Sequence, residues 1–309
     1  MLYDLIFIVL GIYIVLRGAD FLTDGAVAIA ERAHVSQVVI GLTIVAMGTS
    51  MPEFCVSFMS ALKGTSDLAV GNVIGSNIFN TLLIAGCAAA IAPITISPVT
   101  IRRDVPFSIL ASVVLILLIF DGHLSRLNAA LILLFFIIFM TVTLYGAKDA
   151  DEPQTAPKGY TIAKSVFLLL AGLLFLVVGS NVFVDHAVNV AHRLHVSDAV
   201  IGLTVVAGGT SLPELATTLV AARKGNSGIA IGNVLGSNVF NILFILSITG
   251  LVCPMTITGI TPIDMAVLLG SVVLLWMFSA SRLKIERWEA IILLAIFVAY
   301  MSHLIAKTV

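Results

Sequence analysis

Charged residues are scarce in this chain of 309 residues: Asp, Glu, Lys and Arg make up only 11% of it, against about 25% in an ordinary soluble domain. This scarcity excludes a soluble enzyme. There is no excess of positive charge, because 16 Lys and Arg face 17 Asp and Glu, and a surface that binds nucleic acid is therefore excluded. The three cysteines, Cys55, Cys87 and Cys253, match no disulfide or metal-ligand spacing. We expect them to be small core residues.

Apolar residues make up 60% of the chain. Residues 127–146 and 165–184 contain no Asp, Glu, Lys or Arg and are long enough to cross a bilayer. Runs of this kind predict an all-α integral membrane protein, with the lipid bilayer as its partner and no obligate protein partner evident. Ten transmembrane helices are expected, near 2–22, 36–62, 68–92, 105–120, 127–146, 162–184, 199–222, 229–252, 264–280 and 288–306.

The chain repeats itself at a constant offset of 161 residues. Residues 40–53 match 201–214, and residues 71–80 match 232–241. We therefore expect a first five-helix repeat at 1–147, a cytoplasmic linker at 148–160 and a second five-helix repeat at 161–309. Five is an odd number, so the second copy enters the membrane from the opposite side. Two inverted repeats are typical of secondary transporters that work by alternating access.

Lys and Arg are distributed unevenly between the two predicted faces. Twelve of the 16 fall on the face that carries the linker, and four on the other. The positive-inside rule then places the linker in the cytoplasm and both termini outside.

Two carboxylates lie in the middle of predicted membrane helices, where each costs several kcal/mol and therefore indicates function. Glu53 and Glu214 each follow a proline, Pro52 or Pro213, which removes a helix hydrogen bond and disfavours helical geometry in the residue before it. We expect each helix to break at the carboxylate and to free backbone carbonyls as ligands.

Neutral oxygens lie one helical turn apart around these acids. Thr49 precedes Glu53 by four residues, Ser76 precedes Asn80 by four, and the second copy repeats the pattern. Two carboxylates with several neutral oxygens suit Ca²⁺, which takes six to eight oxygen ligands. Neither block contains the His or Cys that zinc, copper or iron would need. The pattern therefore predicts a metal site at Glu53 and Glu214 that holds calcium.

The duplicated blocks Gly-Thr-Ser-x-Pro-Glu and Gly-Ser-Asn-x-Phe-Asn resemble the repeats of the sodium/calcium exchangers, within the cation/calcium exchanger superfamily. The resemblance spans essentially the whole chain. It implies an antiporter rather than an enzyme, with no catalytic residue and no cofactor beyond the transported Na⁺ and Ca²⁺, usually three sodium ions for one calcium. In this family the first and sixth helices slide across the rest of the protein. The short linker leaves no room for a large regulatory domain and indicates a prokaryotic cytoplasmic membrane.

The resemblance also implies a role for individual residues. The calcium ligands would be Glu53, Glu214, Thr49 and Thr210. The sodium ligands would be Glu53, Glu214, Ala46, Ser50, Ser76, Asn80, Ala207, Ser211, Ser237 and Asn241.

Other functions remain open at this point. Asn241 stands where some relatives carry Asp, which makes potassium co-transport less favoured, yet a potassium-dependent or proton-coupled exchanger is still an alternative. A passive calcium channel built from the same helices belongs to a different class, as does an intramembrane hydrolase. The hydrolase would need a nucleophile with a base or a metal-activated water, and neither glutamate block contains a basic partner.

Overall fold

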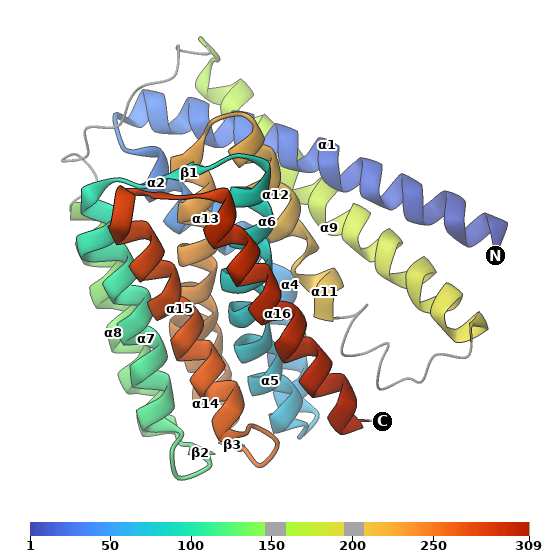
Figure 1. Cartoon of the computed structure of the whole chain (residues 1–309), viewed down its shortest axis with the longest axis vertical. Helices are drawn as coiled ribbons and strands as arrows, with labels where there is room; N and C mark the ends of the chain where they lie inside the picture. Colours follow the sequence, from blue (N-terminus) through green and yellow to red (C-terminus); the bar gives the residue numbers. More distant parts are fainter. Residues whose placement is uncertain (146–158, 195–206, 309) are drawn as a thin grey trace.

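The computed structural model describes residues 1–145, 159–194 and 207–308, and the chain forms a helical bundle (Figure 1). The predicted linker lies almost wholly outside the described residues, as do residues 199–206 of the seventh predicted helix. The elements of the first copy are α1 (Leu2–Ala33), α2 (Gln37–Ile40), η1 (Gly41–Val45), α3 (Ala46–Thr49), α4 (Met51–Leu62), α5 (Ser66–Ile78), η2 (Phe79–Ile84), α6 (Ala85–Ile91), β1 (Ile94–Thr95), η3 (Thr100–Asp104), α7 (Val105–Leu118), β2 (His123–Leu124) and α8 (Arg126–Tyr145).

The elements of the second copy are α9 (Ile162–Arg193), α11 (Ala207–Thr210), α12 (Leu212–Arg223), α13 (Ser227–Val239), η6 (Phe240–Ile245), α14 (Leu246–Val252), β3 (Met255–Thr256), α15 (Pro262–Arg282), β4 (Lys284–Ile285) and α16 (Arg287–Thr308). Within the described ranges, seven helices are long and apolar enough to cross a membrane, and the bent stretch 37–62 makes an eighth. The other two spans of the ten are η3 with α7, and α11 with α12.

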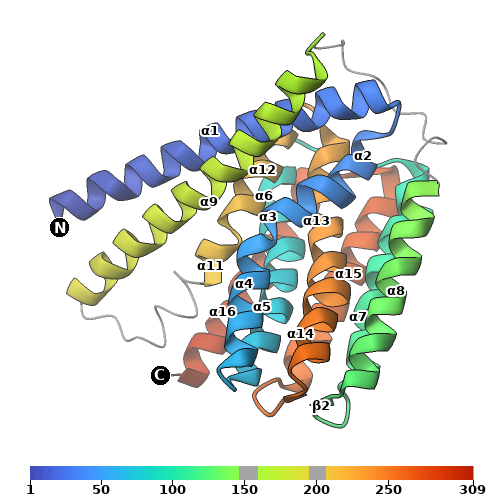
Figure 2. The ribbon, with the colours of Figure 1, turned by 180° about the vertical axis from the view of Figure 1, so that it is seen from behind.

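Two of the helices are much longer than predicted. The helices expected near 2–22 and 162–184 run to Ala33 and Arg193, 32 residues each. Buried small residues such as Ala26 and Ala30 continue the helical packing of the first helix beyond residue 22. At 1.5 Å per residue each helix is about 48 Å long, which exceeds the roughly 30 Å hydrocarbon core. Figures 1 and 2 show the pair lying oblique to the other helices.

Glycines bring α1 and α9 into backbone contact. They recur every seven residues on α1, at Gly11, Gly18 and Gly25, and face Gly179, Gly172 and Ser165 of α9. A Cβ at Gly18 would lie 2.8 Å from the Leu176 nitrogen and 2.9 Å from the Gly172 oxygen. Only glycine permits so close an approach of two helices in a membrane. The two long helices, one from each copy, therefore form a single unit.

The helix that carries each glutamate is broken, but not where the sequence predicted. The axes of 37–49 and 51–62 differ by 48°, and the turn falls at Ser50, with Ser211 at the matching place between α11 and α12. Each proline stands in the first turn of the following helix. Its missing N–H costs no hydrogen bond there, because the first N–H groups of a helix have no acceptor within the helix. Glu53 and Glu214 therefore lie in the first turn of α4 and α12, three residues after the break.

Short strands join loops of the two copies. β1 pairs with β4, and β2 pairs with β3, each over two residues in antiparallel register. The repeat offset of 161 residues relates β1 to β3 and β2 to β4. Figure 1 shows β1 at one end of the bundle and β3 at the other. Equivalent strands thus lie on opposite faces, as inverted repeats require.

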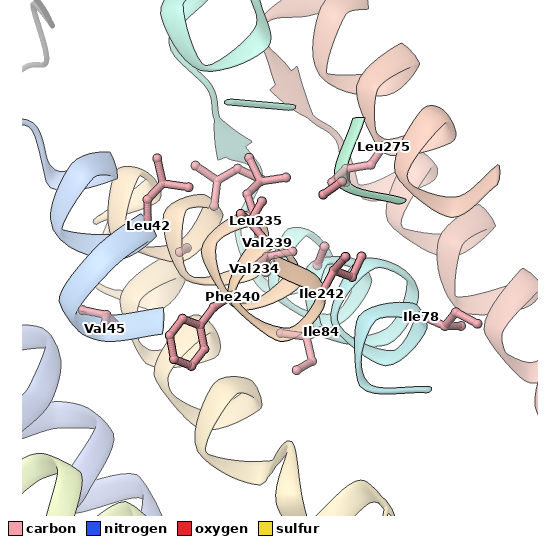
Figure 3. Close-up of a cluster of buried hydrophobic side chains, with 14 of the residues drawn as sticks. Leu42, Val45, Ile78, Ile84, Val234, Leu235, Val239, Phe240, Ile242 and Leu275 are labelled. Atoms are coloured by element: carbon pink, nitrogen blue, oxygen red, sulfur yellow. The ribbon is translucent and has the colours of Figure 1, made fainter. Parts of the chain in front are cut away.

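The core surrounds α13 and η6, whose buried side chains pack with residues of η1, η2 and α15 (Figure 3). Outer faces of the bundle carry apolar side chains instead, because lipid is as apolar as a protein core. Cys55 is one of the exposed residues, while Cys87 and Cys253 are partly buried. The expectation that all three cysteines lie in the core is therefore wrong for Cys55.

Candidate cation-binding site

Glu53 and Glu214 are buried between the two copies, with 0% and 1% of their surface exposed. Hydroxyl groups cross from one copy to the other to reach them. Ser50 donates to Oε1 of Glu214 at 2.8 Å, and Ser211 donates to Oε1 of Glu53 at 2.9 Å. The bonds are related by the repeat symmetry, so each broken helix supplies a carboxylate and binds the carboxylate of its partner.

Each acid lies in the first turn of its helix, where unpaired N–H groups carry partial positive charge. Ser50 and Ser211 occupy the N-cap positions but make no side-chain cap bond to their own helices. Their hydroxyls are used for the opposing carboxylates instead.

Four buried amides form a network between the two copies where the π-helical turns η2 and η6 begin. Asn80 donates to Oδ1 of Asn238, and Asn241 donates to Oδ1 of Asn77, both at 3.2 Å. Asn77 donates to the backbone carbonyl of Asn238 at 3.2 Å. All four side chains are buried. The amide nitrogens of Asn80 and Asn241 are therefore both held by acceptors within the protein.

Several buried oxygens of the region have no hydrogen-bond partner. They are Oε2 of Glu53, Oε2 of Glu214, Oδ1 of Asn80, Oδ1 of Asn241 and the hydroxyl of Ser237. An unpaired buried acceptor is costly. The two amide oxygens can only accept hydrogen bonds, and the two carboxylate oxygens can only accept them when the acids are charged. Carboxylate and carbonyl oxygens are the ligands that hard cations prefer. In the described part of the chain no group of three or more His, Cys, Asp or Glu could hold a metal, so a cation here would be held by two acids and neutral oxygens.

Two further asparagines brace the hairpins that carry the site. Asn72 donates to the Glu53 carbonyl at 3.2 Å and to the Ser57 hydroxyl at 2.9 Å. Asn233 does the same in the second copy, to the Glu214 carbonyl at 3.3 Å and the Thr218 hydroxyl at 3.0 Å. These bonds fix the backbone at each glutamate against the neighbouring helix.

The structure brings most of the predicted site residues together. The hydroxyls of Ser76 and Ser211 lie 3.4 Å apart, and the Thr49 hydroxyl lies 3.2 Å from Oδ1 of Asn233. Thr210 interacts with the Glu53 side chain. The Ala46 carbonyl, which the resemblance implies as a sodium ligand, accepts the Ser50 N–H at 3.0 Å, because α3 runs from Ala46 to Thr49. Ala207 begins α11, and its side chain lies outside what the structure describes.

Sequence reasoning missed the four supporting asparagines. Asn77 and Asn238, like Asn72 and Asn233, occur at equivalent places in the duplicated blocks. An amide kept in both copies of a membrane helix was a usable signal, because a buried amide needs partners.

Two inverted five-helix repeats that bury a set of unpaired, cation-suited oxygens at their interface define a membrane transporter of cations. The chain belongs to the sodium/calcium exchanger family, whose sequence profile matches residues 3–145 and 164–306. The predicted family and ten-helix inverted-repeat fold are thereby confirmed, and the chain is a transporter and not an enzyme.

Several relatives match this chain over nearly its full length. The putative antiporter CaxA of Alkalimonas amylolytica is 38% identical over 99% of this chain and 100% of its own. The sodium/calcium exchanger MaX1 of Methanosarcina acetivorans is 32% identical over 96% of this chain and 97% of its own. The structure of the sodium-calcium exchanger NCX_Mj, soaked with 2.5 mM Na⁺ and 0.1 mM Ca²⁺, matches with a TM-score of 0.86 at 33% identity, over 98% of both chains.

Proposed function

We propose that this protein exchanges sodium for calcium across a prokaryotic cytoplasmic membrane. The observation that carries the proposal is the pair of buried carboxylates, each bound by the opposing copy and each with one oxygen unpartnered. Two negative charges balance one Ca²⁺, and neutral oxygens of Asn80, Asn241, Thr49 and Thr210 complete a coordination shell that smaller cations would fit less well.

Coupling follows from shared ligands. Sodium sites on either side of the calcium site would use Ser50, Ser76 and Ala46 in one half, and Ser211, Ser237 and Ala207 in the other. Both sets require Glu53 or Glu214, so sodium and calcium compete for the same charges. Competition at one site, combined with alternating access, yields exchange in place of co-transport.

The α1 and α9 pair is the element that would move. The glycine seam makes the pair one body, and it crosses the bundle obliquely outside the site (Figure 2). On one face, the Lys224 ammonium lies 2.8 Å from Asp20 and 3.0 Å from Asp24, which ties α1 to the end of α12. On the other face, Lys63 and Asp185 occupy the equivalent positions, and no ion pair joins these two described residues. This difference between faces supports a state that is closed on the Lys224 side.

The orientation of the chain in the membrane sets the direction of transport. With the linker of residues 148–160 between the two repeats in the cytoplasm and both termini outside, the Lys224 side is the cytoplasmic side. Three sodium ions for one calcium would move one net charge per cycle, worth about 2.3 kcal/mol for each 100 mV of membrane potential. An inward sodium gradient would then drive calcium export.

The test is uptake of radioactive calcium into sodium-loaded proteoliposomes diluted into sodium-free buffer. Uptake that needs only internal sodium supports sodium/calcium exchange. Uptake that needs added potassium or a proton gradient would assign the chain to a potassium-dependent or proton-coupled exchanger. Downhill calcium flux without any counter-ion would indicate a channel and contradict exchange.

A further inference from the structure

We propose that Thr81, whose hydroxyl bonds to none of the unpaired oxygens, decides which end of the Asn80 amide faces the cation. The proposal rests on the proposed function, because it concerns the same site. Thr81 lies in η2 and is fully buried, and its hydroxyl makes two hydrogen bonds. It is a positioning residue that acts through Asn238.

The direction of each bond in this chain of groups is fixed by the one before it. The Thr81 hydroxyl donates its single proton to the backbone carbonyl of Asn77 at 2.9 Å. Toward Asn238 the hydroxyl can therefore only accept a hydrogen bond. The amide nitrogen of Asn238 donates to it at 2.8 Å. That orientation turns Oδ1 of Asn238 toward Asn80, whose amide nitrogen donates to it at 3.2 Å. The oxygen of Asn80 is then the end left unpaired in the site.

The other half of the site achieves the same result without a hydroxyl. Asn77 donates directly to the backbone carbonyl of Asn238, an acceptor that cannot change its role. This fixes Oδ1 of Asn77 as the acceptor for Asn241. The residue equivalent to Thr81 by the repeat offset is Ile242, which is buried in the apolar cluster around η6 (Figure 3).

The two arms therefore differ in what sustains them. The Asn241 arm depends on backbone, whereas the Asn80 arm depends on one side-chain hydroxyl. Without that hydroxyl, the Asn238 amide nitrogen loses its acceptor, and the amide can turn so that its oxygen no longer faces Asn80. Asn80 then has no acceptor to hold its nitrogen, and an N–H group in place of an oxygen would repel a cation.

The decisive variant is Thr81→Val, which keeps the branched shape and removes the hydroxyl. We expect the dissociation constant for Ca²⁺, measured with radioactive calcium on the purified full chain, to rise about tenfold or more, as for other residues that orient a metal ligand. The maximal uptake rate should change less than the affinity. Thr81→Ser should retain the affinity of the wild type. Ile242→Val is the matched control at the equivalent position and should leave calcium affinity unchanged.

Double variants separate positioning from general stability. If Thr81 acts through Asn80, Thr81→Val should cause no further loss in an Asn80→Ala background, but should still weaken binding in an Asn241→Ala background. Unchanged affinity in Thr81→Val would overturn the proposal, as would an equal further loss in both backgrounds or a failure of Thr81→Ser to restore binding. Sodium-driven uptake by the wild type is measured alongside, so failure of the proposed exchange is distinguished from failure of the positioning role.

Discussion

Replacing Lys224 with methionine tests whether the ion pairs on one face hold the moving helices in place. The variant keeps the apolar stem of the side chain and removes the charge that bridges Asp20 and Asp24. Burial lowers the pKa of Lys224, but hydrogen bonds to Asp20 and Asp24 outweigh it and raise the pKa above its ordinary value. The ammonium is therefore charged under all conditions of the assay.

The magnitude follows from how exposed these groups are. The side chain of Lys224 is 31% exposed, and those of Asp20 and Asp24 are 36% and 26% exposed. Pairs of this kind contribute about 0.2–1 kcal/mol each, reduced by solvent screening. A loss of about 1 kcal/mol shifts a two-state equilibrium roughly fivefold. Because apparent affinity scales with the fraction of the binding-competent state, calcium affinity should rise by up to that factor on the Lys224 face and fall on the other.

The assay measures half-saturating calcium for uptake from each side of oriented proteoliposomes. Lys63→Met is the matched variant, since Lys63 is the repeat equivalent of Lys224 and would pair with Asp185 only in the opposite state. It should shift the two affinities in the reverse sense. If both variants shift them in the same direction, or neither does, the two lysines do not act as alternating latches and the reasoning is refuted.

Three further predictions concern the seam and the site. Gly18→Ala should lower the melting temperature by a few degrees, at a cost of about 1–3 kcal/mol, because the added Cβ would meet rigid backbone. Gly270→Ala is the control, since a Cβ there would have no atom within 4 Å. Equal melting temperatures of the two variants would contradict the close contact of α1 and α9. Ser50→Ala and Ser211→Ala each remove one donor to a carboxylate and should weaken sodium activation of uptake by similar factors, roughly tenfold; an effect of only one would argue against equivalent roles. Asn241→Asp places charge where an unpaired oxygen now lies and should tighten calcium binding or introduce potassium sensitivity in uptake assays, and no change in either would count against the site.

Much of the fold was predictable because membrane spans and repeats are properties of the sequence alone. An offset of 161 residues relates the two copies without a gap, and an odd number of spans dictates inversion. The lengths of α1 and α9 were not predictable in the same way. Asp20 and Asp24 pair with Lys224, 204 and 200 residues away, and Ala26 and Ala30 are buried beyond them; both kinds of contact exist only in the folded chain.

The acids and hydroxyls of the candidate site could be predicted by type, but their pairing could not. The spacing of Thr49 and Glu53 suggested a shared helix face, whereas the structure pairs Ser50 with Glu214 across the copies. Nor does sequence give the orientation of an amide. That Asn80 turns its oxygen inward depends on a chain of bonds through Asn238, which exists only once the helices have packed.

The most direct test of the account measures calcium binding in competition with sodium, on wild type, Glu53→Gln and Glu214→Gln. Each substitution keeps the size of the side chain and removes one of the two charges that balance Ca²⁺. We expect sodium to displace radioactive calcium from the wild type, and both variants to lose calcium binding while their melting temperatures show that they remain folded. Calcium binding that persists in both variants, or that sodium does not reduce in the wild type, would contradict a shared site.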